Sequence, residues 1–161
     1  MVVASSNRTR AFVSYSHKDR SYLERLRTHL APFVSTQHLD IWDDTRIQAG
    51  QKWKEEIQQA ISLAKVAILL VSADFLASEF IALNELPPLL AGAKQEGVLI
   101  YYVYISTCAI KHTELYQYQA VNSLSKPLKR MGYDYREEVW TQVAEYVSDA
   151  LRLKAVVMDT I

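Results

Sequence analysis

The stretch Val66-Ala67-Ile68-Leu69-Leu70-Val71 is an uninterrupted aliphatic run near the middle of the chain. A short apolar run flanked by segments with helical spacing is typical of a strand that is buried on both faces of a parallel sheet. We therefore expect residues 66–71 to form the central strand of an α/β domain, with helices on both faces of the sheet.

Upstream of this run, short apolar runs alternate with longer amphipathic stretches, which is the pattern of βα units. Strands are expected over residues 11–14 and 38–42. The polar turn of residues 15–18 follows the first strand, and we expect Asp19 to cap the helix that comes next.

The stretch Asp43–Gly50 is too polar and too irregular for a helix or a strand, so we expect a long exposed loop. A helix is predicted after it, over about residues 51–63, because apolar residues recur there at helical spacing. Trp53 and Ile57 belong to this apolar set and are expected to lie in the core.

Downstream of the central run, we expect a helix from Asp74 to about Lys94. Pro87 and Pro88 interrupt it, and because proline lacks an amide donor we expect a kink there. Residues 98–105 predict a further strand.

The pattern is weakest over residues 106–134, where we expect loops, a short helix near residues 115–121 and an edge strand. The last helix is predicted over about residues 136–153, because its apolar residues again recur at helical spacing.

Length and composition describe one ordinary globular domain. The chain has 161 residues, of which 50% are hydrophobic and 22% are charged. We expect a flexible tail over residues 1–9, one domain over residues 10–154 and a second tail over residues 155–161.

The charge balance excludes several classes of partner. Lys and Arg number 18 and Asp and Glu number 18, so no net charge attracts nucleic acid or an anionic membrane. No apolar run approaches the roughly 18 residues of a membrane helix. The N-terminus has no apolar signal segment, and the single Cys108 cannot form an internal disulfide. We expect a cytoplasmic protein without nucleic-acid or membrane partners.

The common motifs for phosphate, metal and nucleophile sites are missing. No glycine-rich phosphate loop occurs in the chain. Cys108 and His112 have no second pair of ligands nearby, so no metal site is expected. Ser14 and Ser72 lack the flanking glycines of a nucleophile elbow.

Five short segments carry more information through their order than any of them does alone. They are FVSYSHxD (residues 12–19), DIWDD (40–44), IxAGxxWxxxI (47–57), VSxDFLxSxF (71–80) and NEL (84–86). This succession resembles the Toll/interleukin receptor (TIR) domain in its bacterial form, and the resemblance covers about residues 10–153.

The resemblance implies a three-layer, flavodoxin-like α/β fold with a central parallel five-stranded sheet. In that fold Asp43–Gly50 matches the BB loop of the family. Some TIR domains are adaptors that only associate with other TIR domains, whereas many bacterial and plant members cleave nicotinamide from NAD+.

In the enzymatic TIR domains the essential carboxylate lies on the helix after the third strand, which maps it onto Glu85. Many of these enzymes carry an aromatic residue four positions before the glutamate, where this chain has Ile81. We expect Trp42, Tyr15 or Phe80 to supply the stacking partner instead.

The resemblance and the expected positions of the loops together nominate a substrate-binding set. Its members are Tyr15, Ser16, His17, Trp42, Asp43, Arg46, Ser78 and Phe80. NAD+ would be the substrate, and neither a cofactor nor a metal is expected.

One carboxylate can suffice for this chemistry, because nicotinamide leaves NAD+ as a neutral molecule and needs no general acid. Glu85 would hold the ribose hydroxyls and stabilise the positive charge that develops on the sugar. Water as acceptor gives ADP-ribose, and an internal nucleophile gives a cyclic isomer.

The residues alone also allow structural interpretations. Glu85 could be a solvated helix residue, with Glu56 as a rival carboxylate. The turn at residues 15–17 could serve only to cap the next helix. Arg46 could meet either a phosphate or a neighbouring subunit.

Two functional hypotheses follow. The first is an NAD+ nucleosidase of bacterial anti-phage signalling, activated by self-association through Asp43–Gly50. The alternative is a non-catalytic scaffold that acts through TIR–TIR contacts. A response-regulator receiver is excluded, because Ser72 and Ser106 stand near the strand ends where its Asp and Lys are required.

Overall fold

The computed structural model describes the backbone of residues 7–159 and the side chains of residues 7–152. Its centre is one five-stranded sheet in the order β2-β1-β3-β4-β5, in which every neighbouring pair is parallel. The strands are β1 (Arg10–Tyr15), β2 (Asp40–Trp42), β3 (Ala64–Val71), β4 (Leu99–Tyr104) and β5 (Gln119–Ala120). The expected three-layer α/β fold, with the aliphatic run in the central strand, is confirmed.

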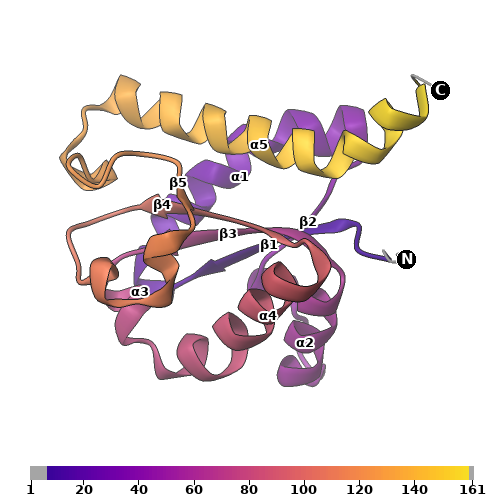
Figure 1. Cartoon of the computed structure of the whole chain (residues 1–161), viewed down its shortest axis with the longest axis horizontal. Helices are drawn as coiled ribbons and strands as arrows, with labels where there is room; N and C mark the ends of the chain where they lie inside the picture. Colours follow the sequence, from indigo (N-terminus) through magenta and orange to yellow (C-terminus); the bar gives the residue numbers. More distant parts are fainter. Residues whose placement is uncertain (1–6, 160–161) are drawn as a thin grey trace.

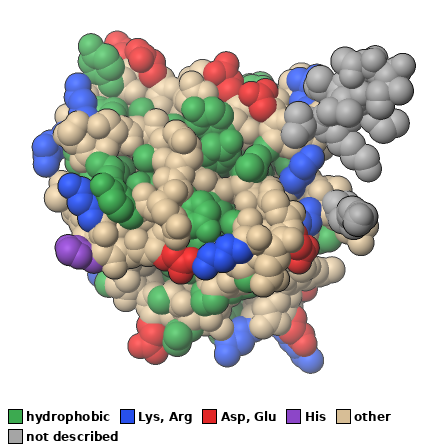
Figure 2. All heavy atoms as spheres, in the orientation of Figure 1, with side chains coloured by type: hydrophobic (Ala, Val, Ile, Leu, Met, Phe, Trp, Pro, Cys, Tyr) green, Lys and Arg blue, Asp and Glu red, His purple; other side chains and the backbone are tan. Residues whose placement is uncertain are grey.

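Helices cover both faces of the sheet (Figure 1). Two long helices, α1 (Arg20–Gln37) and α5 (Tyr133–Asp159), lie on one face. The other face carries α2 (Trp53–Ser62), the short α3 (Ala73–Ala77) and α4 (Leu86–Glu96). The charged side chains of both signs are dispersed over the face seen in Figure 2, in keeping with the zero net charge.

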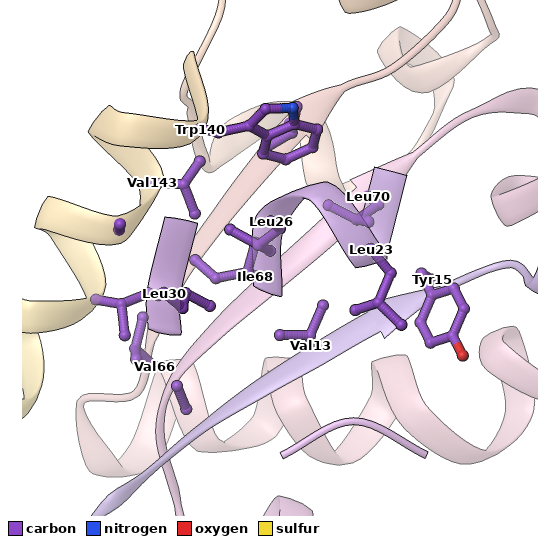
Figure 3. Packing of buried hydrophobic residues seen from close by; sticks show 14 of the residues in the cluster. Val13, Tyr15, Leu23, Leu26, Leu30, Val66, Ile68, Leu70, Trp140 and Val143 are labelled. Carbon is purple, nitrogen blue, oxygen red and sulfur yellow. The ribbon is translucent and has the colours of Figure 1, made fainter. Parts of the chain in front are cut away.

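The side chains of β3 alternate between the two layers, because successive residues of a strand point to opposite faces. Val66, Ile68 and Leu70 pack against α1 and α5, where Leu23, Leu26 and Leu30 of α1 meet Trp140 and Val143 of α5 (Figure 3). The intervening Ala67, Leu69 and Val71 pack against the opposite helices. Burial of each large aliphatic side chain stabilises the fold by about 1.5–3 kcal/mol, which explains why residues 66–71 of this strand are all apolar.

An ion-pair cluster joins α1 to α5 on the outside of this layer. The guanidinium of Arg25 binds both carboxylate oxygens of Glu137, and its Nη2 also donates to the Tyr133 hydroxyl at 3.0 Å. His29 Nε2 lies 3.1 Å from the same carboxylate. The hydrogen bonds from Arg25 lower the pKa of Glu137 to about 2.

The helical region after β3 differs from the expected single helix. α3 ends at Ala77, and a π-helical turn over Ile81–Glu85 precedes α4. Pro87 and Pro88 lie in the first turn of α4, where amide groups have no partner within the helix. The break in regular α-helix therefore lies directly before the prolines, at Glu85 and Leu86, rather than at the prolines themselves.

The polar segment after β2 is more ordered than expected. Residues Asp44–Arg46 form a 3-10 turn, and Asp43 is buried as its N-cap, with its carboxylate accepting from the amide of Thr45 at 2.9 Å. Asp19 makes no capping bond to α1. Its buried carboxylate instead accepts a hydrogen bond from Ser72 at the end of β3, which corrects the expected helix cap.

The weakly patterned region contains the expected edge strand, β5, but only a 3-10 turn over Glu114–Gln117 in place of the short helix. The last helix runs to Asp159, beyond its expected end at Leu153 and into the segment interpreted as a tail. At the other end, Thr9 donates its amide to the Leu63 carbonyl, so this residue of the expected N-terminal tail is attached to the fold.

Residues 1–6 and 160–161 of the two expected tails lie outside the described residues. Along the part of the chain that is described, no helix has the length and apolar character of a membrane span.

Candidate functional site

A cavity of about 710 Å³ opens beyond the carboxyl end of β1, next to β3, and is lined by segments that follow β1, β2 and β3. The strand order reverses between these two neighbouring strands, and open α/β sheets bind their ligands beside such a point. The residues that line the cavity are Tyr15, Ser16, His17, Lys18, Asp44, Ile47, Trp53, Ile57, Ser78, Phe80, Ile81 and Glu85.

Glu85 contributes a buried carboxyl group to this cavity. It is the last residue of the π-helical turn and is only 6% exposed. π-helical turns inside helices often occur at functional sites. Ser14 of β1 points to the same face of the sheet and donates its hydroxyl to Glu85 Oε1 at 2.6 Å. The turn and the strand together fix the direction of the carboxyl group.

Burial raises the pKa of Glu85 to about 7. The hydrogen bond from Ser14 and the charge of His17 lower this pKa, whereas the nearby Asp44 carboxylate raises it. The carboxyl group therefore changes its ionisation near neutral pH, where an ordinary exposed glutamate is fully ionised.

A second polar group forms around Asp44. The hydroxyl of Tyr15 donates to Asp44 Oδ1 at 2.7 Å, and His17 Nε2 lies 2.6 Å from Oδ2. The ring of Tyr15 lies at the edge of the α1–α5 core cluster, with its hydroxyl pointing away from that cluster (Figure 3). Burial and the bond to Asp44 both raise the pKa of Tyr15. The 3-10 turn after β2 is thus tied to the end of β1.

Part of the cavity lining is apolar and aromatic. Trp53 packs on Phe80 with the ring centroids 5.1 Å apart and the planes tilted by 55°. Trp53 is 50% exposed, so its expected place in the core was wrong. It is the first residue of α2, where the apolar face of the helix reaches the open end of the cavity. Ile57 is buried as expected, although it also reaches the cavity wall.

The structure brings together six of the nominated residues in the cavity lining: Tyr15, Ser16, His17, Ser78, Phe80 and Glu85. Ser16 also caps the short turn that follows it, with its hydroxyl accepting from the amide of Lys18. Ser78 likewise accepts from the amide of Ile81 at 3.2 Å. Both serines therefore have a capping role alongside their position in the cavity.

Three nominated residues do not line the cavity. Trp42 is buried and stacks on Phe12 with the ring centroids 5.3 Å apart. Asp43 points inward as the cap described above. Arg46 pairs with Asp40 at 2.9 Å and donates to the carbonyl of Ile41. The rival Glu56 does not line the cavity either.

Asp44 and Trp53 line the cavity but were not among the nominated substrate-binding residues. The signal for Asp44 was its position directly after Asp43, since one residue of such a pair can cap a turn while the other faces a ligand. For Trp53, the signal was its position at the first turn of a helix that follows a loop.

Comparisons with known proteins agree with this fold. The sequence model of the TIR domain family matches residues 11–137. The chain is 27% identical over 139 residues to the uncharacterized protein y4lF of Sinorhizobium fredii. That match covers 86% of this chain and 42% of y4lF, so the chain spans less than half of the length of this relative.

Among solved structures, the fold is similar to the crystal structure of the TIR domain of the Toll-related receptor TRR-2 from Hydra magnipapillata. The TM-score is 0.53 at 17% sequence identity, and the match covers 85% of this chain and 96% of the receptor domain. Because the family model matches more than half of the chain, this chain belongs to the TIR domain family.

Proposed function

We propose that this TIR domain is an NAD+ nucleosidase, which breaks the bond between nicotinamide and ribose and releases ADP-ribose or a cyclic isomer of it. The observation that carries the proposal is the buried carboxyl group of Glu85 in a cavity at the carboxyl ends of the parallel strands. A buried titratable group with a strongly raised pKa in a ligand-sized cavity is typical of an active site.

Cleavage of the bond between nicotinamide and ribose requires one negative charge close to the reacting sugar. When the C1′–N bond breaks, nicotinamide takes the bonding electron pair and leaves as a neutral molecule, while positive charge develops on the ribose. The carboxylate of Glu85 would accept hydrogen bonds from ribose hydroxyls and stabilise that charge. Because Glu85 is shielded from water, the interaction is stronger than on an exposed surface.

The cavity lining offers groups for the different parts of a dinucleotide. Trp53 and Phe80 offer aromatic surface to a planar base. Ser16 and Lys18 offer a hydroxyl donor and a positive charge to ribose and phosphate oxygens. The volume of about 710 Å³ lies within the usual range for sites that bind small molecules.

A TIR scaffold without catalysis is the alternative function. Such a scaffold has no need of a buried carboxyl group, and burial of an ionisable group without a cationic partner destabilises the fold. Ser14 supplies one neutral hydrogen bond to Glu85, which does not replace the lost hydration of a charge. This cost favours the catalytic function over the scaffold.

We also propose that the domain self-associates through Asp43–Gly50 and acts in bacterial anti-phage signalling. Ile47 is half-buried and lines the cavity, so it is not a free anchor for a neighbouring subunit. Ala49 is exposed and does not line the cavity, so it is the better position for a test. Ala49→Asp is expected to flatten a rise of specific activity with protein concentration. Activity that is independent of concentration would contradict this mode of activation.

The test of the proposed function is incubation of NAD+ with the domain at high protein concentration, followed by chromatography of nicotinamide and of the adenine product. Equal amounts of nicotinamide and of ADP-ribose or its cyclic isomer are expected. No release of nicotinamide at any protein concentration would contradict the nucleosidase and favour the scaffold.

A further inference from the structure

The imidazole of His17 and the carboxylate of Asp44 form a dyad that the cleavage of the glycosidic bond does not use. His17 Nε2 lies 2.6 Å from Asp44 Oδ2, and both residues line the cavity that holds Glu85. The side chain of His17 is 76% exposed, so water reaches it freely. An imidazole oriented by a carboxylate is a common form of general base in enzymes.

The contacts of Asp44 determine where the proton of a neutral His17 ring lies. An ionised carboxylate only accepts hydrogen bonds, and Oδ1 already accepts from the Tyr15 hydroxyl at 2.7 Å. Nε2 of His17 must therefore carry the ring proton and donate it to Oδ2. This leaves the lone pair on Nδ1, which makes Nδ1 the basic atom of the dyad.

The dyad and Glu85 are close enough to influence each other. His17, Asp44 and Glu85 line the same cavity, and the charge of Asp44 raises the pKa of Glu85. Tyr15 and His17, at the carboxyl end of β1, both bind Asp44. Tyr15 directly follows Ser14, whose hydroxyl binds Glu85. The basic atom and the carboxylate therefore belong to one site.

We infer that His17, oriented by Asp44, is the general base that activates the water molecule attacking C1′ of the ribose. The inference rests on the proposed cleavage of NAD+ and assigns the step that follows departure of nicotinamide. The water oxygen forms a bond to C1′, one proton of the water passes to His17 Nδ1, and that proton then exchanges with solvent. No other reactant is required.

The inference predicts which acceptors depend on His17. Water must lose a proton as it adds to the sugar, so it benefits from a base. A pyridine nitrogen attacks with its own lone pair and has no proton to lose, so its attack does not benefit from a base. The competition between water and an added pyridine therefore reports on the base and is independent of the rate at which nicotinamide leaves.

The experiment measures the ratio of ADP-ribose to exchanged dinucleotide when NAD+ and 3-acetylpyridine are both present. His17→Gln keeps an amide donor toward Asp44 but has no basic nitrogen, and we expect it to lower the ratio by about 10-fold or more. His112→Gln, at an exposed position outside the cavity, is the matched control and is expected to leave the ratio unchanged.

Asp44→Asn provides a second test, because its amide can donate to Nε2 and so move the ring proton to Nδ1. We expect this variant to lower the ratio although His17 is intact. An unchanged ratio in His17→Gln would overturn the inference. Complete loss of nicotinamide release in His17→Gln would also overturn it, because His17 would then act in bond cleavage. Absence of release by the wild-type protein would instead contradict the proposed function itself.

Discussion

Two glutamates on opposite faces of the sheet have pKa values that are shifted in opposite directions. Glu85, on the α2–α4 side, is buried, has Ser14 as a neutral hydrogen-bond donor, and its pKa is raised to about 7. Glu137 on α5 is held by the guanidinium of Arg25, and its pKa is lowered to about 2. On the α1–α5 side of the sheet, the ion pair of Glu137 stabilises the fold. On the other side, the buried carboxyl group of Glu85 lowers the stability of the fold when it is ionised.

The difference teaches how to distinguish a structural carboxylate from a functional one in this fold. A positive partner and partial hydration stabilise the charge of Glu137, as is usual for an ion pair between helices. Glu85 has no cation within bonding distance among the described residues, and its ionised form is disfavoured until a ligand with hydroxyl groups or positive charge arrives.

The largest expected effect is on activity. Glu85→Gln keeps the shape of the side chain but removes its charge, so we expect nicotinamide release to fall on the order of 100- to 1000-fold. Glu137→Gln should leave release within about 2-fold of wild type while lowering the free energy of unfolding by about 1 kcal/mol. Chromatography and chemical denaturation test the pair of variants. Normal release by a folded Glu85→Gln protein would show that the wrong carboxyl group has been chosen.

The next effect is on stability as a function of pH. The raised pKa of Glu85 means that the unfolded chain loses this proton first, so the free energy of unfolding falls as the pH rises from about 4.5 to about 7. The shift corresponds to a loss of up to about 3 kcal/mol. Glu85→Gln should abolish this loss and be more stable than wild type at pH 8.

The lowered pKa of Glu137 has the opposite effect on the free energy of unfolding, which it raises as the pH rises. Its contribution is complete above the ordinary glutamate pKa and is lost as the pH falls toward 2. The side chain of Glu137 is 21% exposed, so solvent screening limits this contribution to about 1 kcal/mol. Urea denaturation across the pH range measures both effects. Identical pH curves for wild type and Glu85→Gln would contradict the comparison.

A smaller effect is expected on the pH profile of activity. Nicotinamide release needs the ionised form of Glu85, so it should rise with pH to a plateau above about 7. Ser14→Ala removes the hydrogen bond that lowers the pKa of Glu85 and should move the midpoint upward by about one pH unit. Ser148→Ala is the control, because Ser148 is also buried but donates to Gln37 between α5 and α1. A midpoint that shifts equally in both variants would contradict the role of Ser14.

The smallest effect concerns the aromatic pairs of the two regions. Trp53→Ala should raise the KM for NAD+ by about 3- to 10-fold with little change in stability, because Trp53 is half-exposed. Tyr146→Ala removes a ring that stacks on Tyr101 with the centroids 4.7 Å apart, so it should lower the melting temperature and leave KM unchanged. Steady-state kinetics and thermal denaturation separate the two outcomes. An unchanged KM for Trp53→Ala would show that the aromatic part of the cavity lining does not contribute to substrate binding.

Much of the fold could be predicted from the periodicity of apolar residues. The central strand was evident because burial on both faces excludes polar side chains from residues 66–71. The π-helical turn over Ile81–Glu85 was not evident, because its sequence is compatible with an ordinary helix and tertiary packing decides between the two. An edge strand was expected within residues 106–134, but its position was not evident, because β5 is only two residues long and has no alternating pattern.

The parts of the candidate site that follow the ends of strands could be predicted from the sequence. The directions of the side chains in the turn after β2 could not. The position of Glu85 and of the turn after β1 follows from the order of the motifs. The 3-10 turn after β2 points Asp43 inward and Asp44 toward Tyr15, and a polar sequence does not reveal that choice. Arg46 forms an ion pair with the neighbouring carboxylate of Asp40 and does not line the cavity.

The central claim is that the fold holds Glu85 ready to ionise near neutral pH while it keeps Glu137 ionised. Titration of protein labelled with 13C at the glutamate side-chain carboxyl groups, followed by NMR, tests this most directly, with Glu85→Gln and Glu137→Gln used to assign the two signals. The account predicts a midpoint near pH 7 for Glu85 and near pH 2 for Glu137. A Glu85 signal that titrates near pH 4.5, like an ordinary glutamate, would contradict it.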